Sequence, residues 1–586
     1  MTDMLTRWGR NLDPRAILPQ YPRPQLVRDS YLNLNGRWEY TVTAADAAEP
    51  DHYDTTIVVP FSPEAPLSGV GRALRPEEHA WYRRDLTLPE GFHSTGHRLL
   101  LHFGAVDQCC RVYCNGVPVG SHVGGYLPFH CDVTDALRPT GNTIVVSVRD
   151  TTDTGRLSRG KQSRQPGGIW YTAQSGIWQT VWVESVPAQH IRTAVLTPTP
   201  DRDGVVVELD ATVDGTAQLR ILDAGTVMSR TTVDTARPTV VPVPNARLWS
   251  PQDPHLYDVE LTLGTDRVTS YFGMRTFGVG PDDDGCPRLL LNGRPYFHAG
   301  VLDQGYWPDG LYTAPSDEAM IADITAMKDL GFTMLRKHIK IEPLRWYHHC
   351  DRLGMLVWQD MVNGGGRYRR TVVSGPEVSA AISLDDRQYR SFARDDATDR
   401  ARFRQEVRDT VTLLRNTVAV AVWVPFNEGW GQFDAAEVAA EVAALDPTRQ
   451  VDHASGWHDQ GAGDFRSLHV YGRRFRAPRR PDGRVLALTE YGGYGLRIPE
   501  HSWGETAFDY RGHDDSDALG ASFLALHTEQ VVPAIQVGLS ATVYTQLSDV
   551  ETEVNGLLSY DRGVVKIDPD LVRSATARLR YPGPTA

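Results

Sequence analysis

After Gly280, short apolar runs alternate with segments in which apolar residues recur every three or four positions. The runs are rich in Val, Ile and Leu and are bounded by turn-forming residues, a pattern typical of strands buried on both faces. We predict eight such strands, at residues 296–302, 333–338, 355–360, 418–428, 451–455, 468–471, 485–490 and 541–547.

Helices are expected between several of these strands. One should begin after Ser316, a residue type that caps helix N-termini, and should end at Gly331. A second should end at Gly354, and a third has apolar side chains at helical spacing over residues 403–414. Strands and helices in alternation predict a (β/α)8 TIM barrel, to which we assign residues 281–586.

The first half of the chain has a different pattern, with short alternating strands and frequent turn residues. Over residues 32–186 no segment has helical spacing, and Asn115-Gly116 predicts a two-residue hairpin turn. Residues 1–187 are therefore expected to form a Pro- and Arg-rich arm followed by a β jelly-roll sandwich. A second set of short strands predicts an immunoglobulin-like β-sandwich over residues 188–280.

Composition narrows the classes of function. The net charge is −13, from 60 basic and 73 acidic residues, which argues against nucleic acid or an anionic membrane as the main partner. No apolar run reaches the roughly 18 residues that a membrane span requires. The N-terminus lacks the apolar core of a secretion signal, so we expect a cytoplasmic protein.

No cofactor and no metal are expected. The six Cys have no metal-ligand spacing and should be reduced, mostly buried thiols. The His residues, including His348-His349, also lack such spacing, and no phosphate-binding glycine loop is present. The 14 Trp and 23 Tyr are compatible with a carbohydrate substrate, because aromatic faces suit sugar rings, although most should lie in the core.

Two of the predicted barrel strands end in a glutamate. Glu428 follows the fourth strand and Glu490 ends the seventh, and the C-terminal strand ends form the active-site face of a (β/α)8 barrel. A retaining glycosidase needs two carboxylates, one to protonate the leaving oxygen and one to attack the anomeric carbon. Asn427 could hydrogen-bond the sugar 2-hydroxyl, and Tyr471 could hold the nucleophile ionised. Taken alone, either glutamate could instead form an ion pair at the rim.

These residues resemble glycoside hydrolase family 2, whose members include β-galactosidases, β-glucuronidases and β-mannosidases. The resemblance covers nearly the whole chain and rests on ordered motifs at residues 104–107, 113–116, 124–126, 175–182, 248–257, 272–275, 291–297, 350–360, 427–428 and 489–491. It implies a retaining exo-β-glycosidase in which Glu428 is the acid/base and Glu490 the nucleophile.

The resemblance also implies a set of residues that bind substrate. Asn427 would contact the 2-hydroxyl, Tyr471 would lie beside the nucleophile, and Tyr544 occupies the place of a family Trp platform. The wall and roof of the sugar pocket would come from Arg336, His338, Asp303, Trp307 and Trp170. For the wall and platform residues, a role in the core or in an ion pair is the simpler alternative.

Departures from the family patterns bear on the sugar. Family β-glucuronidases carry an Asn-x-Lys pair for the sugar carboxylate, but here Glu553-Val554-Asn555 has no Lys, which disfavours glucuronides. Large β-galactosidases have a His where this chain has Gly493, a jelly-roll Asp where it has an aromatic near Trp170, and metal ligands that it does not clearly reproduce. We therefore expect a neutral sugar, a galactoside (pyranose or furanose) or an arabinoside, and no required metal.

Two alternatives remain open from the sequence. A carbohydrate-binding protein could keep this fold without turnover, and a barrel can also carry unrelated chemistry. A homo-oligomer is compatible with the sequence, which names neither the sugar nor the aglycone.

Overall fold

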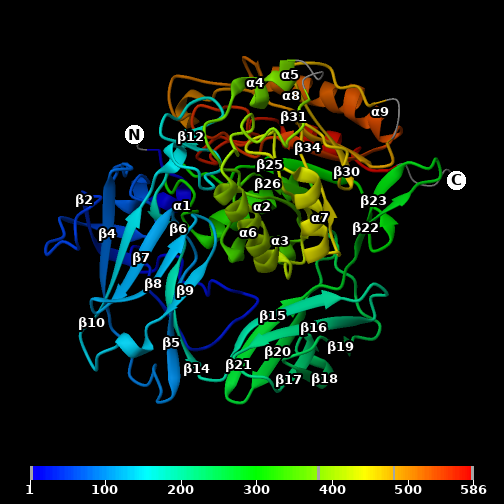
Figure 1. Cartoon of the computed structure of the whole chain (residues 1–586). Coiled ribbons are helices and arrows are strands. Elements are labelled where there is room, and N and C mark those ends of the chain that lie inside the picture. The colour runs from blue at the N-terminus through cyan, green and yellow to red at the C-terminus, as the bar shows by residue number, and fades with distance from the viewer. Residues whose placement is uncertain (1–3, 379–382, 479–481, 582–586) are drawn as a thin grey trace.

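The computed structural model describes residues 4–378, 383–478 and 482–581. Figure 1 shows three bodies that follow one another along the chain: a blue-to-cyan β-sandwich, a smaller teal-to-green β-sandwich and a green-to-red barrel. Both sandwiches contact the barrel, for example where Trp178 O accepts from Thr313 Oγ1 and where Arg275 Nε donates to Val418 O. The predicted combination of jelly-roll, immunoglobulin-like and TIM-barrel domains is confirmed.

The first sandwich packs a six-stranded sheet against a four-stranded one. Asn115 and Gly116 have φ values of 54° and 80°, which confirms the predicted hairpin turn. The larger sheet contains β3 (Thr55–Val59), β2 (Gly36–Ala44), β4 (Glu78–Leu86), β10 (Asn142–Arg149), β7 (Cys109–Cys114) and β8 (Val117–Val123). The smaller contains β1 (Tyr31–Asn33), β14 (Val181–Pro187), β5 (His97–Phe103) and β9 (Phe129–Asp132).

The second sandwich has seven strands, and its core is formed by side chains from both sheets, among them Val207 and Val259. One sheet contains β15 (Ile191–Pro198), β16 (Gly204–Ala211) and β19 (Thr239–Pro242). The other contains β18 (Thr226–Asp234), β17 (Thr216–Asp223), β20 (Tyr257–Leu263) and β21 (Asp266–Phe272). A hairpin of β22 (Phe277–Pro281) and β23 (Pro287–Leu291) leads into the barrel.

The eight predicted barrel strands form one parallel sheet in the order β29-β28-β27-β26-β25-β34-β31-β30, which is that of a (β/α)8 barrel. Six of them are buried on both faces, as the apolar runs predicted, whereas β29 and β30 include half-buried positions. Their bounds are β25 (His298–Asp303), β26 (Met334–Lys337), β27 (Leu356–Asp360), β28 (Val420–Val424), β29 (Gln450–Val451), β30 (Phe465–Tyr471), β31 (Val485–Gly492) and β34 (Leu539–Thr545).

The fourth strand is shorter than predicted. It ends at Val424, before Pro425, which has no backbone N–H to donate to a neighbouring strand. Asn427 and Glu428 therefore lie on the loop that follows. Asn427 forms an isolated bridge with Ser455, and Glu428 has a left-handed φ of 49°, a conformation that is uncommon outside glycine and often found at functional sites.

Helices cover the outside of the barrel, and local capping residues determine where several of them begin and end. The Ser316 hydroxyl accepts from Ala319 N at 3.2 Å, and Gly331 and Gly354 have left-handed φ, which confirms the predicted helix ends. The longer helices are α2 (Asp317–Asp329), α3 (Leu344–Leu353), α6 (Ala397–Leu414), α7 (Ala435–Leu445), α8 (Ser516–Leu526) and α10 (Pro569–Thr576). Within the described ranges, no helix is long and apolar enough to cross a membrane.

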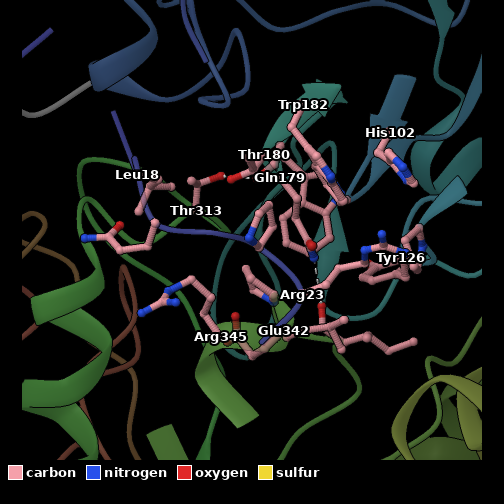
Figure 2. A pocket seen from close by; sticks show the side chains of 18 of the residues that line it. Leu18, Arg23, His102, Tyr126, Gln179, Thr180, Trp182, Thr313, Glu342 and Arg345 are labelled. Atoms are coloured by element: carbon pink, nitrogen blue, oxygen red, sulfur yellow. Dashed lines mark hydrogen bonds between the residues drawn. The ribbon is translucent and has the colours of Figure 1, made fainter. Parts of the chain in front are cut away.

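A cavity of about 180 Å³ lies between the jelly-roll domain, the N-terminal arm and the barrel. Figure 2 shows Trp182 and Tyr126 on the jelly-roll side of it, with Arg23 of the arm and Glu342 and Arg345 on the barrel side. Neither predicted catalytic glutamate lines this cavity. It is a gap in the domain interface, and the candidate chemistry lies elsewhere.

Candidate active site

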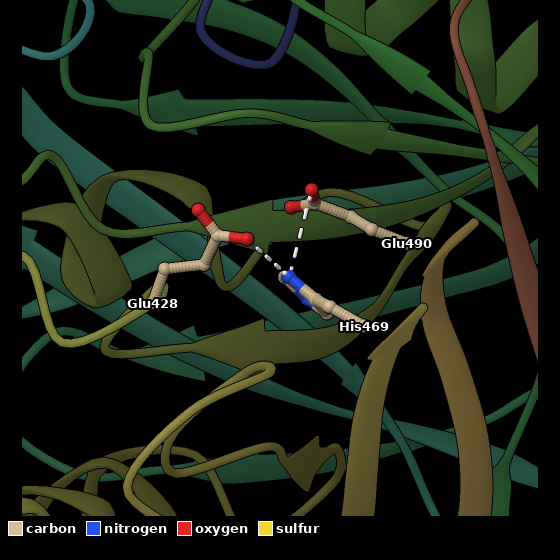
Figure 3. A group of neighbouring side chains, drawn as sticks. All are labelled: Glu428, His469 and Glu490. Atoms are coloured by element: carbon tan, nitrogen blue, oxygen red, sulfur yellow. Dashed lines mark hydrogen bonds and ion pairs between the residues drawn. The ribbon is translucent and has the colours of Figure 1, made fainter. Parts of the chain in front are cut away.

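The two predicted catalytic glutamates face one histidine at the C-terminal ends of the barrel strands (Figure 3). His469 Nδ1 lies 2.7 Å from Glu428 Oε1 and 3.5 Å from Glu490 Oε2. One donor atom from each of the three side chains lies within 4.8 Å of the others. The fold therefore brings a carboxylate from the loop after the fourth strand close to one from the seventh strand.

Glu490 is buried and held by two donors. Arg336 Nη1 donates to Oε1 at 3.1 Å, and the Tyr471 hydroxyl donates to Oε2 at 2.6 Å. Burial raises the pKa of the Glu490 carboxyl, and the nearby Glu428 carboxylate raises it further. The Arg336 charge and the Tyr471 hydrogen bond act in the opposite direction, because both stabilise the ionised form that a nucleophile needs.

Arg336 also orients Asn427. Its Nη2 donates to Asn427 Oδ1 at 2.8 Å, and its Nε and Nη2 each donate to Asp360 at 3.0 Å. With Oδ1 occupied, the Asn427 amide nitrogen is left without a hydrogen-bond partner in the described part of the chain. That nitrogen is a donor available to a sugar hydroxyl, as the sequence predicted for Asn427.

His338 directs an unprotonated nitrogen, Nε2, toward Glu490. Its Nδ1 lies 2.9 Å from Gln304 Oε1, while Gln304 Nε2 donates to Gln546 Oε1 at 2.8 Å. Because Gln304 Oε1 only accepts, His338 carries its hydrogen on Nδ1. The Nε2 atom lies 3.8 Å from Glu490 Oε1, and burial lowers the pKa of His338 well below its usual range. His338 is thus a neutral acceptor beside the nucleophile.

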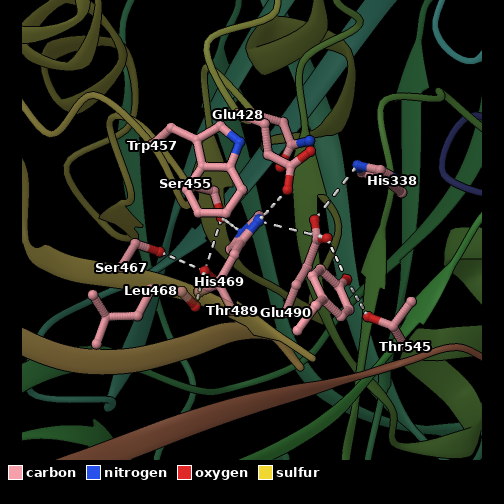
Figure 4. A network of polar contacts seen from close by, with 12 residues as sticks. His338, Glu428, Ser455, Trp457, Ser467, Leu468, His469, Thr489, Glu490 and Thr545 are labelled. Carbon is pink, nitrogen blue, oxygen red and sulfur yellow. Dashed lines mark hydrogen bonds and ion pairs between the residues drawn. The ribbon is translucent and has the colours of Figure 1, made fainter. Parts of the chain in front are cut away.

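His469 was not predicted from the sequence, although a signal was present. It lies two residues before Tyr471 on β30, and residues two apart on a strand point to the same face. Tyr471 was assigned to the pocket, so His469 should have been assigned with it. Figure 4 shows the imidazole in contact with both glutamates and, on its other side, with Ser455.

Three predicted sugar contacts are not brought to the glutamates. Tyr544 packs on Phe523 of α8 at 5.0 Å between ring centroids and is therefore turned to the helix layer; the next residue, Thr545, meets the Tyr471 hydroxyl at 2.7 Å. Two others have protein partners of their own: Trp307 packs on Trp8 of the arm at 6.1 Å, and Asp303 forms an ion pair with Lys337 at 2.6 Å.

Trp170 does reach the barrel from the jelly-roll domain. Its ring lies 5.2 Å from that of Trp430, two residues after Glu428. Lys161, which was not predicted from the sequence, lies beside these rings: its Nζ is 4.8 Å from the Trp430 centroid, 5.6 Å from that of Tyr171 and 5.9 Å from that of Trp170. Lys161 is 5% exposed, and its ammonium group has neither a hydrogen bond nor an ion pair with the residues described.

The loop that follows β34 carries hydrogen-bond acceptors for the jelly-roll loop that contains Tyr171 and Thr172. Glu553 accepts from the Tyr171 hydroxyl and from Asn555 Nδ2, and Glu551 accepts from Thr172 N at 2.8 Å. Burial raises the pKa of Glu551 to about 7. The lysine of this region, Lys566, donates to Asp549 and to two backbone carbonyls. The one lysine that the structure describes in this loop region is thus already engaged by protein acceptors.

A divalent ion could bind to the Glu428, His469 and Glu490 trio, since oxygen and imidazole donors so close together suit such an ion. An ion held there would occupy both carboxylates and prevent their use as acid and nucleophile. The arrangement therefore fits proton transfer and covalent attack better than metal chemistry.

Comparison with known proteins gives the same domain order. Models of "Glycosyl hydrolases family 2" match residues 31–187 (sugar binding domain), 189–275 and 287–476 (TIM barrel domain). Solved structures of β-glucuronidases from an uncultured Clostridium sp. and from Ruminococcus gnavus superpose with TM-scores of 0.74. They cover 94% and 96% of this chain, which covers 99% of each, at 16% and 17% identity, so they show the shared fold.

Curated relatives match over part of their length. A "Putative beta-glucuronidase" of Formosa agariphila is 28% identical over 48% of this chain and 35% of its own length. The β-glucuronidase of Rattus norvegicus is 25% identical over 64% of this chain and 59% of its own. A β-galactosidase of Thermoanaerobacter pseudethanolicus is 26% identical over 56% of this chain and 46% of its own. From its three family domains in their order, the chain belongs to family 2 of the glycosyl hydrolases.

Proposed function

We propose that this protein is a retaining exo-β-glycosidase that works by double displacement. The observation that carries the proposal is the separation of Glu428 and Glu490, whose facing oxygen atoms lie within 4.8 Å of one another. Carboxyl groups about 5–5.5 Å apart are typical of retaining enzymes, whereas inverting enzymes keep them about 6.5–9.5 Å apart to admit a water molecule.

The two carboxylates have different surroundings and hence different roles. Glu490, bound by Arg336 and Tyr471, attacks the anomeric carbon while Glu428 gives its proton to the leaving oxygen. In the second half of the reaction Glu428 takes a proton from water, which displaces Glu490 from the sugar. Asn427 Nδ2, aimed by Arg336, donates to the 2-hydroxyl.

An exo mode of action is supported by the roof of the site. The loop with Trp170 and Tyr171 reaches over the barrel, where Trp170 packs on Trp430 and Tyr171 donates to Glu553. These contacts between domains fix the loop beside the segment that carries Glu428, which favours a single terminal sugar over a continuous chain.

For the sugar, we propose a neutral galactoside, pyranose or furanose, or an arabinoside. Glu551 and Glu553 occupy the loop where a uronate-binding lysine would be expected, and Lys566 is engaged by Asp549. Acidic side chains at this edge disfavour a second carboxylate from the substrate.

A second candidate substrate, a β-glucuronide, is favoured by Lys161. This buried ammonium has no carboxylate partner in the structure as described, and buried charges are generally paired. A sugar carboxylate could supply the missing charge. Several of the similar proteins are named β-glucuronidases, which is consistent with this alternative.

A screen of aryl β-glycosides tests both the reaction and the sugar. The set contains galactopyranose, galactofuranose, arabinose, mannose and glucuronic acid, assayed with the wild type, Lys161→Met and Lys161→Arg. The proposal predicts turnover of a neutral glycoside that does not need the Lys161 charge. Turnover of the glucuronide alone, lost about 10²-fold in Lys161→Met and largely kept in Lys161→Arg, would favour the second candidate. If no aryl β-glycoside of the set is hydrolysed, the alternative of a carbohydrate-binding protein is favoured.

A further inference from the structure

We infer that a chain of buried hydroxyl groups, anchored at Asp452, fixes the tautomer of His469 and through it keeps a proton on Glu428. This inference rests on the proposed function, because it assigns His469 as the positioning residue of the general acid. The side chains between Asp452 and His469 come from β30 (Ser467), β31 (Thr489) and the loop after β29 (Ser455), and they are linked to one another by hydrogen bonds (Figure 4).

The direction in which hydrogen is donated along the hydroxyl chain is set at the Asp452 end. Ser467 Oγ donates to Asp452 Oδ2 at 2.7 Å, and a carboxylate can only accept. A serine has one hydrogen, so Ser467 must accept in its second contact, with Thr489 Oγ1 at 2.7 Å. Thr489 is therefore a donor to Ser467 and accepts from Ser455 Oγ at 2.9 Å.

The same reasoning decides which nitrogen of the His469 imidazole carries the hydrogen. Ser455 gives its only hydrogen to Thr489, so its contact with His469 Nε2 at 2.9 Å requires the hydrogen to be on Nε2. Burial lowers the pKa of His469 to about 3, so the ring carries one hydrogen near neutral pH. Nδ1 is then a bare acceptor directed at Glu428.

A bare nitrogen beside a carboxyl group favours its protonated form. The 2.7 Å contact between His469 Nδ1 and Glu428 Oε1 can be a hydrogen bond only if the hydrogen belongs to Glu428. The ionised form would face a lone pair and, beyond it, the Glu490 carboxylate. Glu428 thus holds the proton that it gives to the leaving oxygen, and after that transfer it is a stronger base toward water.

Other charged and titratable groups surround this cluster and are unchanged by breaking the hydroxyl chain. Arg336 and Tyr471 contact Glu490, Asp360 is bound by Arg336, and His338 lies 3.8 Å from Glu490. At the far end, burial raises the pKa of Asp452, while the Ser467 hydrogen bond and the charges of His453 and Arg336 oppose the rise. A change confined to Ser467 therefore acts on Glu428 through the chain.

Ser467→Ala tests the inference at a distance from the substrate. Without Ser467, Thr489 can turn its hydrogen toward Ser455 Oγ, and Ser455 can then donate to His469 Nε2. The hydrogen of His469 moves to Nδ1 and stabilises ionised Glu428. We expect the basic limb of the kcat/KM profile to move down by about one to two pH units for an aryl glycoside with a poor leaving group. A dinitrophenyl glycoside, which needs little acid assistance, should show no such shift.

Two controls accompany this variant. Ser540→Ala removes another buried barrel serine, whose hydroxyl donates to the backbone carbonyls of Pro287 and Gly538, and its profile should match the wild type. Ser467→Thr keeps the hydroxyl and should restore most of the profile. Should Ser467→Ala fold poorly, Ser455→Ala breaks the same chain one link nearer to His469. A basic limb identical to that of the wild type in a folded variant would overturn the inference.

A measurement without turnover separates this inference from the proposed function. Nitrogen NMR of ¹⁵N-histidine-labelled protein, with the His469 signal assigned from His469→Asn, reports which ring nitrogen carries hydrogen. The inference predicts hydrogen on Nε2 in the wild type and on Nδ1 in Ser467→Ala. Hydrogen on Nδ1 in the wild type would contradict it even in an active enzyme. The predicted tautomers in a protein inactive on every glycoside would refute the function alone.

Discussion

At the scale of single residues, Arg336 is the side chain on which the site depends. It is fully buried and bonds Asp360, Asn427 and Glu490 at once. One planar guanidinium thereby fixes the proposed nucleophile Glu490, the proposed sugar donor Asn427 and Asp360, the carboxylate that balances its charge. Neither lysine nor glutamine could hold all three in the same geometry.

Glu490→Gln should abolish turnover. The amide keeps the shape of the side chain but cannot attack the anomeric carbon, so kcat should fall to background while the fold is preserved. Hydrolysis of the best aryl β-glycoside of the screen measures the loss, and circular dichroism checks the fold. Activity near that of the wild type would exclude Glu490 as the nucleophile.

Tyr471→Phe should lower kcat by about 10²-fold with little change in KM. The variant removes the 2.6 Å hydrogen bond to Glu490 Oε2, which helps to keep the nucleophile ionised and to orient it. Tyr544→Phe is the matched control, because Tyr544 packs on Phe523 in the helix layer, and its kinetics should stay near those of the wild type. Equal effects of the two changes would refute this assignment of Tyr471.

At the scale of elements, much of the fold could be predicted because its signals are local. Apolar runs gave the eight strands, and Ser316, Gly331 and Gly354 gave helix ends, since caps depend on a few neighbouring residues. The inward or outward direction of a side chain at a strand end is not local. It depends on pairing with neighbouring strands, so Tyr544 was assigned to the pocket in place of Thr545.

Contacts between distant elements also escaped prediction. Lys161 of the jelly-roll domain meets Trp430 of the barrel, and Asp452 acts on Glu428 through serines and a threonine that have no special spacing. No periodicity marks such residues, because each is an ordinary polar side chain until the fold places it. The two candidate catalytic glutamates could be predicted because the ends of barrel strands are a fixed location.

Trp170→Ala tests the role of the jelly-roll loop as part of the pocket. The variant removes an aromatic surface that packs on Trp430, so we expect KM to rise about 10-fold with a smaller change in kcat. Tyr113→Ala, in a half-buried cluster elsewhere in the same domain, controls for general effects on the sandwich. If both variants change KM equally, Trp170 has no specific part in binding.

At the scale of the whole molecule, the N-terminal arm ties the three domains together. Thr6 donates to Asp309 of the barrel, Arg23 pairs with Glu184 of the jelly roll, and Arg28 with Asp266 of the immunoglobulin-like domain. The last two ion pairs have buried carboxylates, so the loss of one partner leaves a buried charge with weaker compensation.

Asp266→Ala should lower the free energy of unfolding by about 3 kcal/mol, because it removes the closer of the two carboxylates that pair with buried Arg28 and leaves only Glu184, at 3.5 Å. Activity at room temperature should be unchanged, since Arg28 and Asp266 lie outside the site formed by Glu428 and Glu490. Asp210→Ala breaks an exposed ion pair with Arg192 and should cost no more than about 0.5 kcal/mol. Urea unfolding, with activity as one probe, compares the stabilities of the two variants. Equal free energies of unfolding would contradict a stabilising role for the Arg28–Asp266 pair.

The most direct test of the central claim is the product formed by Glu428→Ala in the presence of azide. Removing the acid/base should slow release of the glycosyl-enzyme, and azide can enter the space left by the carboxylate and attack from that face. The account predicts restored turnover of an activated aryl β-glycoside and a β-glycosyl azide, identified by proton NMR. An α-glycosyl azide would contradict retention, and absence of any rescue would contradict the role assigned to Glu428.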